Sequence, residues 1–336
     1  MGCFPTLTLG IETSCDDTAA AVLSGRTVLS EAISGQSHAS FGGVVPEFAA
    51  RAHQENILPI IDRVLSLAEA SGRGLGRRQL GLIAVTRGPG LMGSLLVGVE
   101  TARALSLAWR VPAVGVNHIE GHIMAPLLDS DVAPPFLSLV VSGGHTEIIR
   151  VDDVGRYSLL GATRDDAAGE AYDKAARIMG LPYPGGPEID RLARAGDPRA
   201  FDFPVPFKNT RAVEFSFSGL KTALLQQVSG MHGDLPLADL CASFQRAVTD
   251  ALVSKTELAV RQTGITTVCV SGGVAANSAL RSAIASAAPR VVLPAPSRCT
   301  DNAAMVALAG YERAVRGLEL PPLVPDPSLS LCGRAI

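Results

Sequence analysis

The spacing of apolar and polar positions along the chain predicts an α/β protein. Residues 7–11 and 18–23 are strand-like and flank a polar, acidic turn, which predicts a β-hairpin. A second hairpin of the same design is predicted from residues 137–141 and 146–151, which flank a glycine-rich turn. Because one such hairpin opens each half of the chain, the pattern indicates a duplicated α/β architecture.

Longer periodic segments between and after the hairpins predict the remaining elements. Helices are expected at residues 56–70, 93–109, 167–179, 238–262 and about 301–315, and further strands at 82–86 and 267–270. The proline-rich stretch at 318–328 is expected to be irregular.

The segment His118-Ile119-Glu120-Gly121-His122 is the clearest candidate for chemistry. Two histidines four apart on a helix lie about 40° apart around its axis, so both rings can reach one metal ion. A pair of structural histidines is an equal alternative at this point. Zinc proteases instead carry glutamate beside the first histidine, as general base. Glu120 stands one position further along and is expected to point away from the metal face, which disfavours hydrolysis.

Composition limits the class of protein. The 336 residues, of which 47% are hydrophobic, suffice for two domains. A net charge of −3 gives no overall attraction to nucleic acid, so a polyanion must meet a local basic patch or another subunit. Arg73, Arg77 and Arg78 form one small cluster, for which a solvated loop is the simpler interpretation. Six cysteines without a C-x-x-C pair, and no signal sequence or long apolar run, indicate a cytoplasmic protein.

Three glycine-rich loops follow predicted strands. Residues 88–93 spell G-x-G-x-x-G, the dinucleotide fingerprint, but Pro89 lacks a backbone donor and no acidic residue ends a neighbouring strand about twenty residues later. Close packing explains these glycines better. The loops at 142–145 and 271–277 could each approach a phosphate, or be ordinary turns; together with the acidic first turn they favour a nucleotide cleft.

Carboxylates elsewhere could complete these sites. Asp173 could accept hydrogen bonds from ribose hydroxyls, although spacing alone favours a solvated acidic helix face. Asp301 could cap the last helix, or could add a carboxylate to the histidine pair and complete a site for Fe(II) or Zn(II). Spacing alone cannot bring Asp301 to His118.

Seven motifs occur in order over about residues 7–318, namely Glu12 to Thr18, Gly42 to Glu47, His118 to His122, Val141 to His145, Phe215 to Lys221, Ser271 to Asn277 and Cys299 to Asn302. Together they are similar to those of the tRNA threonylcarbamoyladenosine transferases of the TsaD/Gcp type. The resemblance implies the actin-like ATPase fold of sugar kinases and heat-shock chaperones, with two duplicated lobes around a nucleotide cleft. The lobes are expected at residues 1–134 with about 296–325 and at 135–295, and 326–336 are expected to form a tail.

The resemblance also implies an activity and its residues. The threonylcarbamoyl group of L-threonylcarbamoyladenylate would pass to N6 of adenosine 37 in tRNAs reading ANN codons, with release of AMP. The implied ligands of one divalent metal, Fe²⁺ in preference to Zn²⁺, are His118, His122 and Asp301. The residues implied to hold the adenylate are Val141, Ser142, Gly143, Gly144, His145, Asp173, Gly186, Asp190 and Asn277. Asp17 and Ala303 stand where glutamate and glycine are common, and neither removes a ligand.

A general base and the partners complete this set of expectations. Glu12 and Asp16, on the tip of the first hairpin, are the candidates for removing the amine proton. The resemblance implies a shorter paralogue of the same fold (TsaB type) and a P-loop ATPase (TsaE type) as partners beside tRNA, and no membrane. The alternatives are an actin-fold ATPase or kinase, and a non-catalytic scaffold subunit of the same complex.

Overall fold

The computed structural model divides the chain into two compact units. It describes residues 7–36, 38, 41–70 and 79–332. The first unit comprises Met1–Val132 and Asp301–Ile336, and the second comprises Ala133–Thr300. The predicted basic cluster of Arg73, Arg77 and Arg78 lies outside the described residues.

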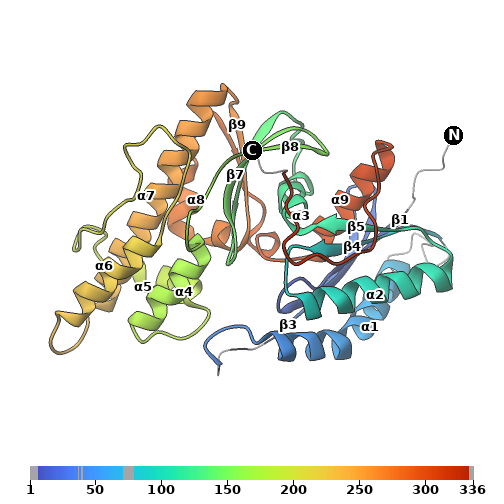
Figure 1. Cartoon of the computed structure of the whole chain (residues 1–336), viewed down its shortest axis with the longest axis horizontal. Coiled ribbons are helices and arrows are strands. Elements are labelled where there is room, and N and C mark those ends of the chain that lie inside the picture. The colour runs from blue at the N-terminus through green and yellow to red at the C-terminus, as the bar shows by residue number, and fades with distance from the viewer. Residues whose placement is uncertain (1–6, 37, 39–40, 71–78, 333–336) are drawn as a thin grey trace. The chain divides into compact units, whose positions relative to one another are not determined.

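The first unit is built on a mixed sheet of order β3-β2-β1-β4-β5 (Figure 1). Its strands are β1 (Leu7–Glu12), β2 (Asp17–Ser24), β3 (Thr27–Gly35), β4 (Leu80–Gly88) and β5 (Ala113–Asn117). The first three pair antiparallel, whereas β4 runs parallel to both β1 and β5. The helices of this unit are α1 (Pro46–Ala70), α2 (Met92–Trp109), α3 (His118–Met124), the short 3₁₀ turn Ala125–Leu127 and α9 (Ala303–Val315).

Alternation along β1 decides which side chains face the candidate site. Leu7, Leu9 and Ile11 point into the apolar core formed with α1 and α2. The intervening positions face α9: a Cβ on Gly10 would lie 2.1 Å from the Ala303 carbonyl oxygen, so only glycine allows this helix to approach the sheet. Glu12 is two residues beyond Gly10 and therefore faces the same side as α9.

Parallel strands bring their carboxyl ends to one edge of this sheet. β1 ends at Glu12, β4 ends just after Thr86, and β5 leads directly into α3. The Asn117 side chain caps α3 by accepting hydrogen bonds from the amides of Ile119 and Glu120. The histidines therefore follow the strand ends, where ligand sites of open α/β sheets form.

The second unit repeats the topology of the first. Its sheet has the order β10-β9-β6-β7-β8, with β6, β7 and β8 antiparallel and β6, β9 and β10 parallel. The strands are β6 (Phe136–Val141), β7 (Thr146–Asp153), β8 (Arg156–Ala162), β9 (Thr267–Ser271) and β10 (Arg290–Val292). The predicted hairpins and the predicted duplication are thus confirmed.

Helices of the second unit pack on its sheet around a second core. They are α4 (Ala168–Ile178), α5 (Gly185–Ala193), α6 (Ser218–Ser229), α7 (Leu237–Thr263) and α8 (Ser278–Ile284), with 3₁₀ turns at Gly273–Ala276 and Pro296–Arg298. The core contains Leu137, Leu139 and Val141 of β6 and a large buried face of α7, including Phe244 and Leu252.

Two predicted helix starts differ from the structure. α1 begins at Pro46, ten residues before the expected position 56, because the inward positions of its first turns hold the small Ala49 and the polar His53, while the large apolar Phe48 is exposed. The cap of α9 is Asn302, whose side chain accepts from the Met305 amide, and not Asp301. The Asp301 carboxylate is consequently available for another role.

Candidate metal centre and nucleotide pocket

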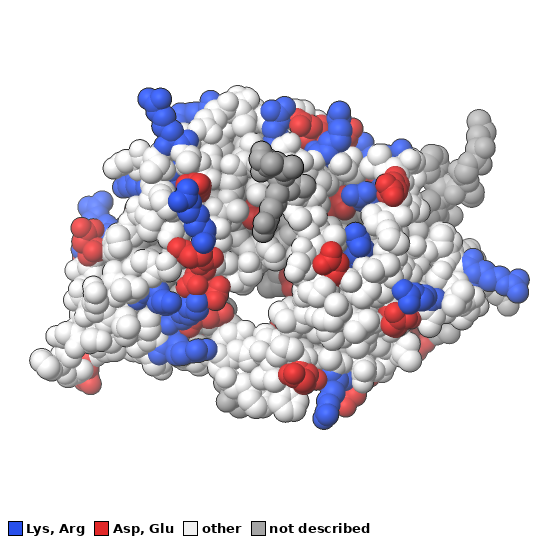
Figure 2. All heavy atoms as spheres, in the orientation of Figure 1, with Lys and Arg blue, Asp and Glu red and all other residues white. Residues whose placement is uncertain are grey.

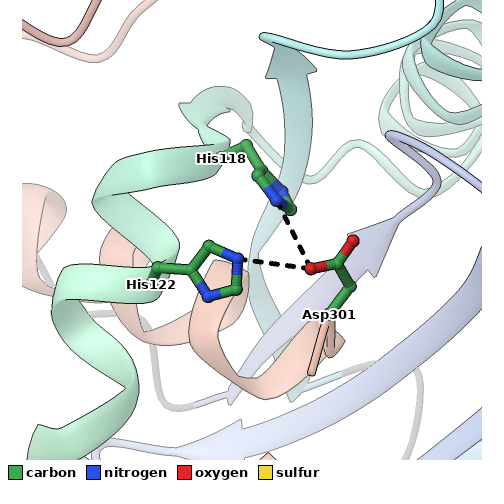
Figure 3. Close-up of side chains that lie close together, drawn as sticks. All are labelled: His118, His122 and Asp301. Carbon is green, nitrogen blue, oxygen red and sulfur yellow. Dashed lines mark ion pairs between the residues drawn. The ribbon is translucent and has the colours of Figure 1, made fainter. Parts of the chain in front are cut away.

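His118, His122 and Asp301 converge within the first unit. One ligand atom from each lies within 4.8 Å of the others. Asp301 Oδ1 is 3.4 Å from Nε2 of His118 and 3.2 Å from Nε2 of His122, and both rings point toward it from α3 (Figure 3). The helical spacing of α3 brings the two rings together, and Asp301, two residues before α9, supplies the carboxylate.

These separations fit a shared metal ion. At metal–ligand distances of about 2.0–2.2 Å, two atoms bound to one ion lie about 3.0–3.5 Å apart. Both contacts of Asp301 fall in that range. Two imidazoles and one carboxylate form the donor set typical of Fe(II) sites with open coordination positions, and Zn(II) also accepts it.

The His122 ring gives an independent sign that this cluster suits a metal ion. It is 0% exposed, yet neither ring nitrogen has a hydrogen-bond partner in the part of the chain that the structure describes. Nε2 lies near Asp301, as an ion-pair contact without hydrogen-bond geometry. Buried ring nitrogens are normally satisfied, so this ring is suited to donate a lone pair to an ion.

Glu12 holds the other ring in place. Its Oε2 lies 3.0 Å from His118 Nδ1 and accepts a hydrogen bond of 2.7 Å from the Thr86 hydroxyl. Its Oε1 accepts from the Ser14 amide, and the Ser14 hydroxyl lies 3.2 Å from the same His118 nitrogen. A carboxylate on Nδ1 fixes the ring and leaves Nε2 directed at Asp301, as in carboxylate–histidine–metal arrangements.

Charges in this cluster stabilise one another. Burial opposes ionisation of Glu12 and Asp301, but the neighbouring His118 outweighs it, so the pKa of Glu12 is lowered and that of Asp301 lies well below its usual range. Burial also opposes protonation of His118, yet Asp301 and Glu12 raise its pKa well above the ordinary value. The cluster therefore favours a positive charge between two carboxylates, which a metal ion would also supply.

The acidic turn after β1 adds further negative charge beside this cluster. Burial, followed by repulsion from Asp301, Asp16 and Glu12, raises the pKa of Asp17 to about 7. His53 of α1 holds the turn, with its Nε2 2.9 Å from the Cys15 carbonyl oxygen. The half-buried Asp16 lies on the turn itself. Such an excess of carboxylates attracts a cation.

The glycines of the 88–93 motif serve packing rather than a phosphate. A Cβ on Gly90 would lie 2.5 Å from the Ser14 carbonyl oxygen, and one on Gly88 would lie 1.9 Å from that of Asp326. The amide of Leu91 donates to the Ser14 oxygen at 2.8 Å. These glycines bring the α2 loop against the acidic turn, which supports the packing interpretation.

The second unit contains a pocket of about 460 Å³ at the carboxyl ends of its parallel strands. This volume suits a nucleotide-sized ligand. Five of the predicted substrate residues line the pocket, namely Gly143, Asp173, Gly186, Asp190 and Asn277.

Polar side chains of the pocket are already fixed by the protein. Asp173 Oδ1 accepts from the Gly185 amide at 2.8 Å, and burial raises the pKa of Asp173 despite that bond. Asp190 Oδ1 accepts from the Ser278 hydroxyl at 2.7 Å. Asn277 caps α8 through its carbonyl oxygen and donates to Gln245. The pocket is thus preorganised before any ligand binds.

Other predicted substrate residues lie beside the pocket rather than on its wall. Val141 is buried in β6, and Ser142, Gly144 and His145 form the following turn, where the Ser142 hydroxyl accepts from the His145 amide at 3.1 Å. They can therefore shape the turn that carries Gly143.

Several residues of the wall were not among those predicted from the sequence. Gly169, Tyr172, Arg194 and Thr300 are examples. A Cβ on Gly169 would lie 2.7 Å from the Ser142 carbonyl oxygen, so this glycine lets α4 approach the turn. Small residues at the start of a helix gave no distinctive signal for this contact.

Hydropathy of the helices bears on membrane association. Among the described residues, no helix combines the length and the apolar character needed to cross a bilayer.

Comparisons with known proteins point to one family. The model of the family described as "TsaD: tRNA N6-adenosine threonylcarbamoyltransferase" matches residues 27–308. The tRNA N6-adenosine threonylcarbamoyltransferase of Geobacter metallireducens is 54% identical over 322 residues, which cover 93% of each chain. That of Anaeromyxobacter dehalogenans is 50% identical over 339 residues, or 97% of this chain and 100% of the relative.

Solved structures of lower identity share the fold. Component A of the (R)-2-hydroxyglutaryl-CoA dehydratase of Acidaminococcus fermentans has a TM-score of 0.56 at 16% identity and covers 92% of this chain and 99% of its own. HypF of T. kodakarensis has a TM-score of 0.59 at 15% identity, over 94% of this chain and 49% of its own. These likenesses confirm the predicted actin-like ATPase fold and carry no functional argument.

Proposed function

The chain belongs to the tRNA N6-adenosine threonylcarbamoyltransferase family, and from this premise we propose how its residues act. The enzyme transfers a threonylcarbamoyl group to N6 of an adenosine in tRNA. In the proposed reaction L-threonylcarbamoyladenylate is the donor, and adenosine 37 of tRNAs that read ANN codons is the acceptor. The new bond joins N6 to the carbamoyl carbon, the bond from that carbon to the phosphate oxygen breaks, and AMP and the amine proton leave.

The convergence of two histidines and one carboxylate carries the proposal. We assign His118, His122 and Asp301 as ligands of one divalent metal, with Fe²⁺ preferred by the donor set and Zn²⁺ as the alternative. When bound, the metal offers positive charge and open coordination positions to oxygen atoms of the donor. The protein itself keeps Asp301 Oδ1 at 3.4 Å and 3.2 Å from the two histidine nitrogens.

Glu12 acts through His118 rather than on substrate. Both carboxylate oxygens already accept hydrogen bonds or contact the ring, and the side chain is 0% exposed. This engagement supports a positioning role, which replaces the earlier expectation that Glu12 removes a proton. Asp16, half-buried on the same turn, is the remaining candidate for the general base that accepts the N6 proton.

The pocket of the second unit is the proposed site for the adenylate part of the donor. Asp173 and Asp190 offer oxygens to hydroxyl groups of the ribose, and Gly143 and Gly186 leave the backbone open to the phosphate or base. A preformed pocket holds the activated donor in one orientation, which lowers the entropic part of the barrier. A tRNA substrate also implies a cytoplasmic location.

Partners are proposed from charge and from an exposed apolar groove. Acidic and basic side chains are interspersed on the face drawn in Figure 2, and the net charge is −3, so tRNA binding is expected to be shared with another protein. A groove of about 760 Å³ lies between α1 and α2 and includes the exposed Leu58 and Leu96. We propose this groove as the docking face of the shorter paralogue, and a P-loop ATPase as a further partner.

Docking can be tested with matched leucines. Leu58→Asp should abolish co-purification of the paralogue, whereas Leu159→Asp, at an equally apolar and 47% exposed position on β8 of the second unit, should not. Equal co-purification of both variants would reject the groove.

The activity itself is tested by mass spectrometry of tRNA nucleosides in a bacterial strain depleted of its own enzyme. The unmodified chain, expressed with its partners, should restore N6-threonylcarbamoyladenosine, and the His122→Ala chain should not. An ATPase or kinase would leave the nucleoside absent with either chain, and full restoration by His122→Ala would reject the proposed metal site.

A further inference from the structure

Glu120 stands between the two ligand histidines but faces away from them into the protein. Its side chain is 1% exposed. Arg313 Nε lies 2.9 Å from each of its carboxylate oxygens, and Arg313 is itself only 16% exposed. A nearly buried ion pair therefore sits within the histidine motif, on the side opposite the rings.

The pair joins the two helices that determine the metal geometry. α3 carries His118 and His122, and α9 follows Asp301 after one intervening residue. These helices also touch where a Cβ on Gly121 would come within 3.2 Å of Met305 Cγ. Movement of α3 along α9 would change the distance from both rings to Asp301.

We propose that Glu120 and Arg313 are positioning residues that fix α3 against α9 and thereby set the separation of the histidine nitrogens from Asp301. A metal site requires its ligands within about 0.5 Å of the productive geometry. A buried charge that loses its partner drives the surrounding structure to rearrange or admit water. The ion pair thus resists the helix shift that would spoil the ligand distances. This inference rests on the proposed metal site.

The same helix offers a matched control. Glu312, adjacent to Arg313, is also buried at 2% exposure, and its Oε1 lies 2.6 Å from Arg26 Nε. Arg26 lies in the turn between β2 and β3, so this second pair ties α9 to the sheet. Removing the Glu120 charge breaks its pair with Arg313, and removing the Glu312 charge breaks its pairs with Arg26 and Arg316. Only the Glu120 pair connects α9 to α3.

The experiment compares Glu120→Gln, Arg313→Lys and Glu312→Gln in the full chain. Co²⁺ affinity is measured by titration against a chelator, the visible absorption of bound Co²⁺ reports the ligand geometry, and urea unfolding of the metal-free protein reports stability. Glu120→Gln should weaken Co²⁺ binding about 10- to 100-fold and change the spectrum, and Arg313→Lys should do so to a smaller extent. Glu312→Gln should lose comparable stability and keep the affinity and spectrum of the unmodified chain.

Every other outcome would contradict either the metal site or the positioning role of the ion pair. If the unmodified chain binds no Co²⁺, the metal site itself fails. If it binds Co²⁺ and folded Glu120→Gln binds equally well, or if Glu312→Gln loses as much affinity, the positioning role is wrong. Should Glu120→Gln not fold, Arg313→Lys decides in the same way, because it keeps the positive charge and alters the geometry of the pair.

Discussion

The metal cluster of the first unit and the pocket of the second occupy matching places in two sheets of the same topology, yet they are built differently. The cluster consists of histidine and carboxylate side chains, mostly buried, whose polar atoms lie 3.0–3.4 Å apart. The pocket owes its shape to glycines and to acidic side chains already bonded to the protein. Substitutions in the cluster should therefore change the metal and stability together, whereas those in the pocket should change ligand affinity alone.

Removal of one ring from the cluster should have the largest effect. His122→Ala loses one of three ligands, so metal affinity should fall at least about 100-fold and transfer by a larger factor. Because this ring has no hydrogen-bond partner among the described residues, the metal-free variant should lose only packing free energy, about 2 kcal/mol. Metal analysis and urea unfolding of the metal-free protein check both parts. Normal metal content in His122→Ala would show that His122 is not a metal ligand.

The two acidic residues of the first turn should separate into different roles. Asp16→Asn should slow transfer about 100-fold or more with unchanged metal content, as expected for loss of a general base. Glu12→Gln should instead weaken metal binding about 10- to 100-fold, since His118 loses its carboxylate partner. Single-turnover transfer from preformed threonylcarbamoyladenylate, with metal content determined in parallel, distinguishes them. Full transfer by either variant would remove the role assigned to that residue.

Two neighbouring glycines test the assignment of the pocket in the second unit. A Cβ has open space at both Gly143 and Gly144, but only Gly143 lines the pocket. Gly143→Ala should weaken AMP binding about tenfold without loss of stability, because a methyl group blocks close approach of the backbone. Gly144→Ala is the control and should bind AMP normally in calorimetry. Equal affinities for both variants would place the nucleotide elsewhere.

A smaller effect should appear in the way the stability of the metal-free protein depends on pH. The pKa of Asp17 is about 7 in the folded state and 3.8 in the unfolded chain. Between about pH 4 and pH 7 the folded protein therefore keeps a proton on Asp17 that the unfolded chain has already lost. The contribution of Asp17 to the free energy of unfolding should consequently fall as pH rises through this window. Asp17→Asn should make that fall shallower in urea unfolding of the full chain, and an unaltered slope would exclude Asp17 as its source.

The residues of the metal cluster and those of the pocket can be predicted from the sequence to different extents, for physical reasons. Helical spacing alone places His118 and His122 on one face. Asp301 is assigned to them only through resemblance, because contacts over so long a sequence separation depend on the fold. Glu120 points away from the rings as expected, but its burial against Arg313 depends on α9, which spacing cannot position. In the pocket, Gly169 escaped detection because it contributes through close backbone approach rather than through a reactive group.

The most direct test of the metal assignment is transfer by metal-stripped protein. The purified chain with its partners is treated with a chelator, desalted, and given preformed threonylcarbamoyladenylate and tRNA, with and without added Fe²⁺ or Zn²⁺. N6-threonylcarbamoyladenosine is then measured by mass spectrometry. We expect almost no product from the stripped protein, recovery on addition of one of these metals, and no recovery for His122→Ala. Full product formation by protein shown to contain no metal would contradict the metal assignment.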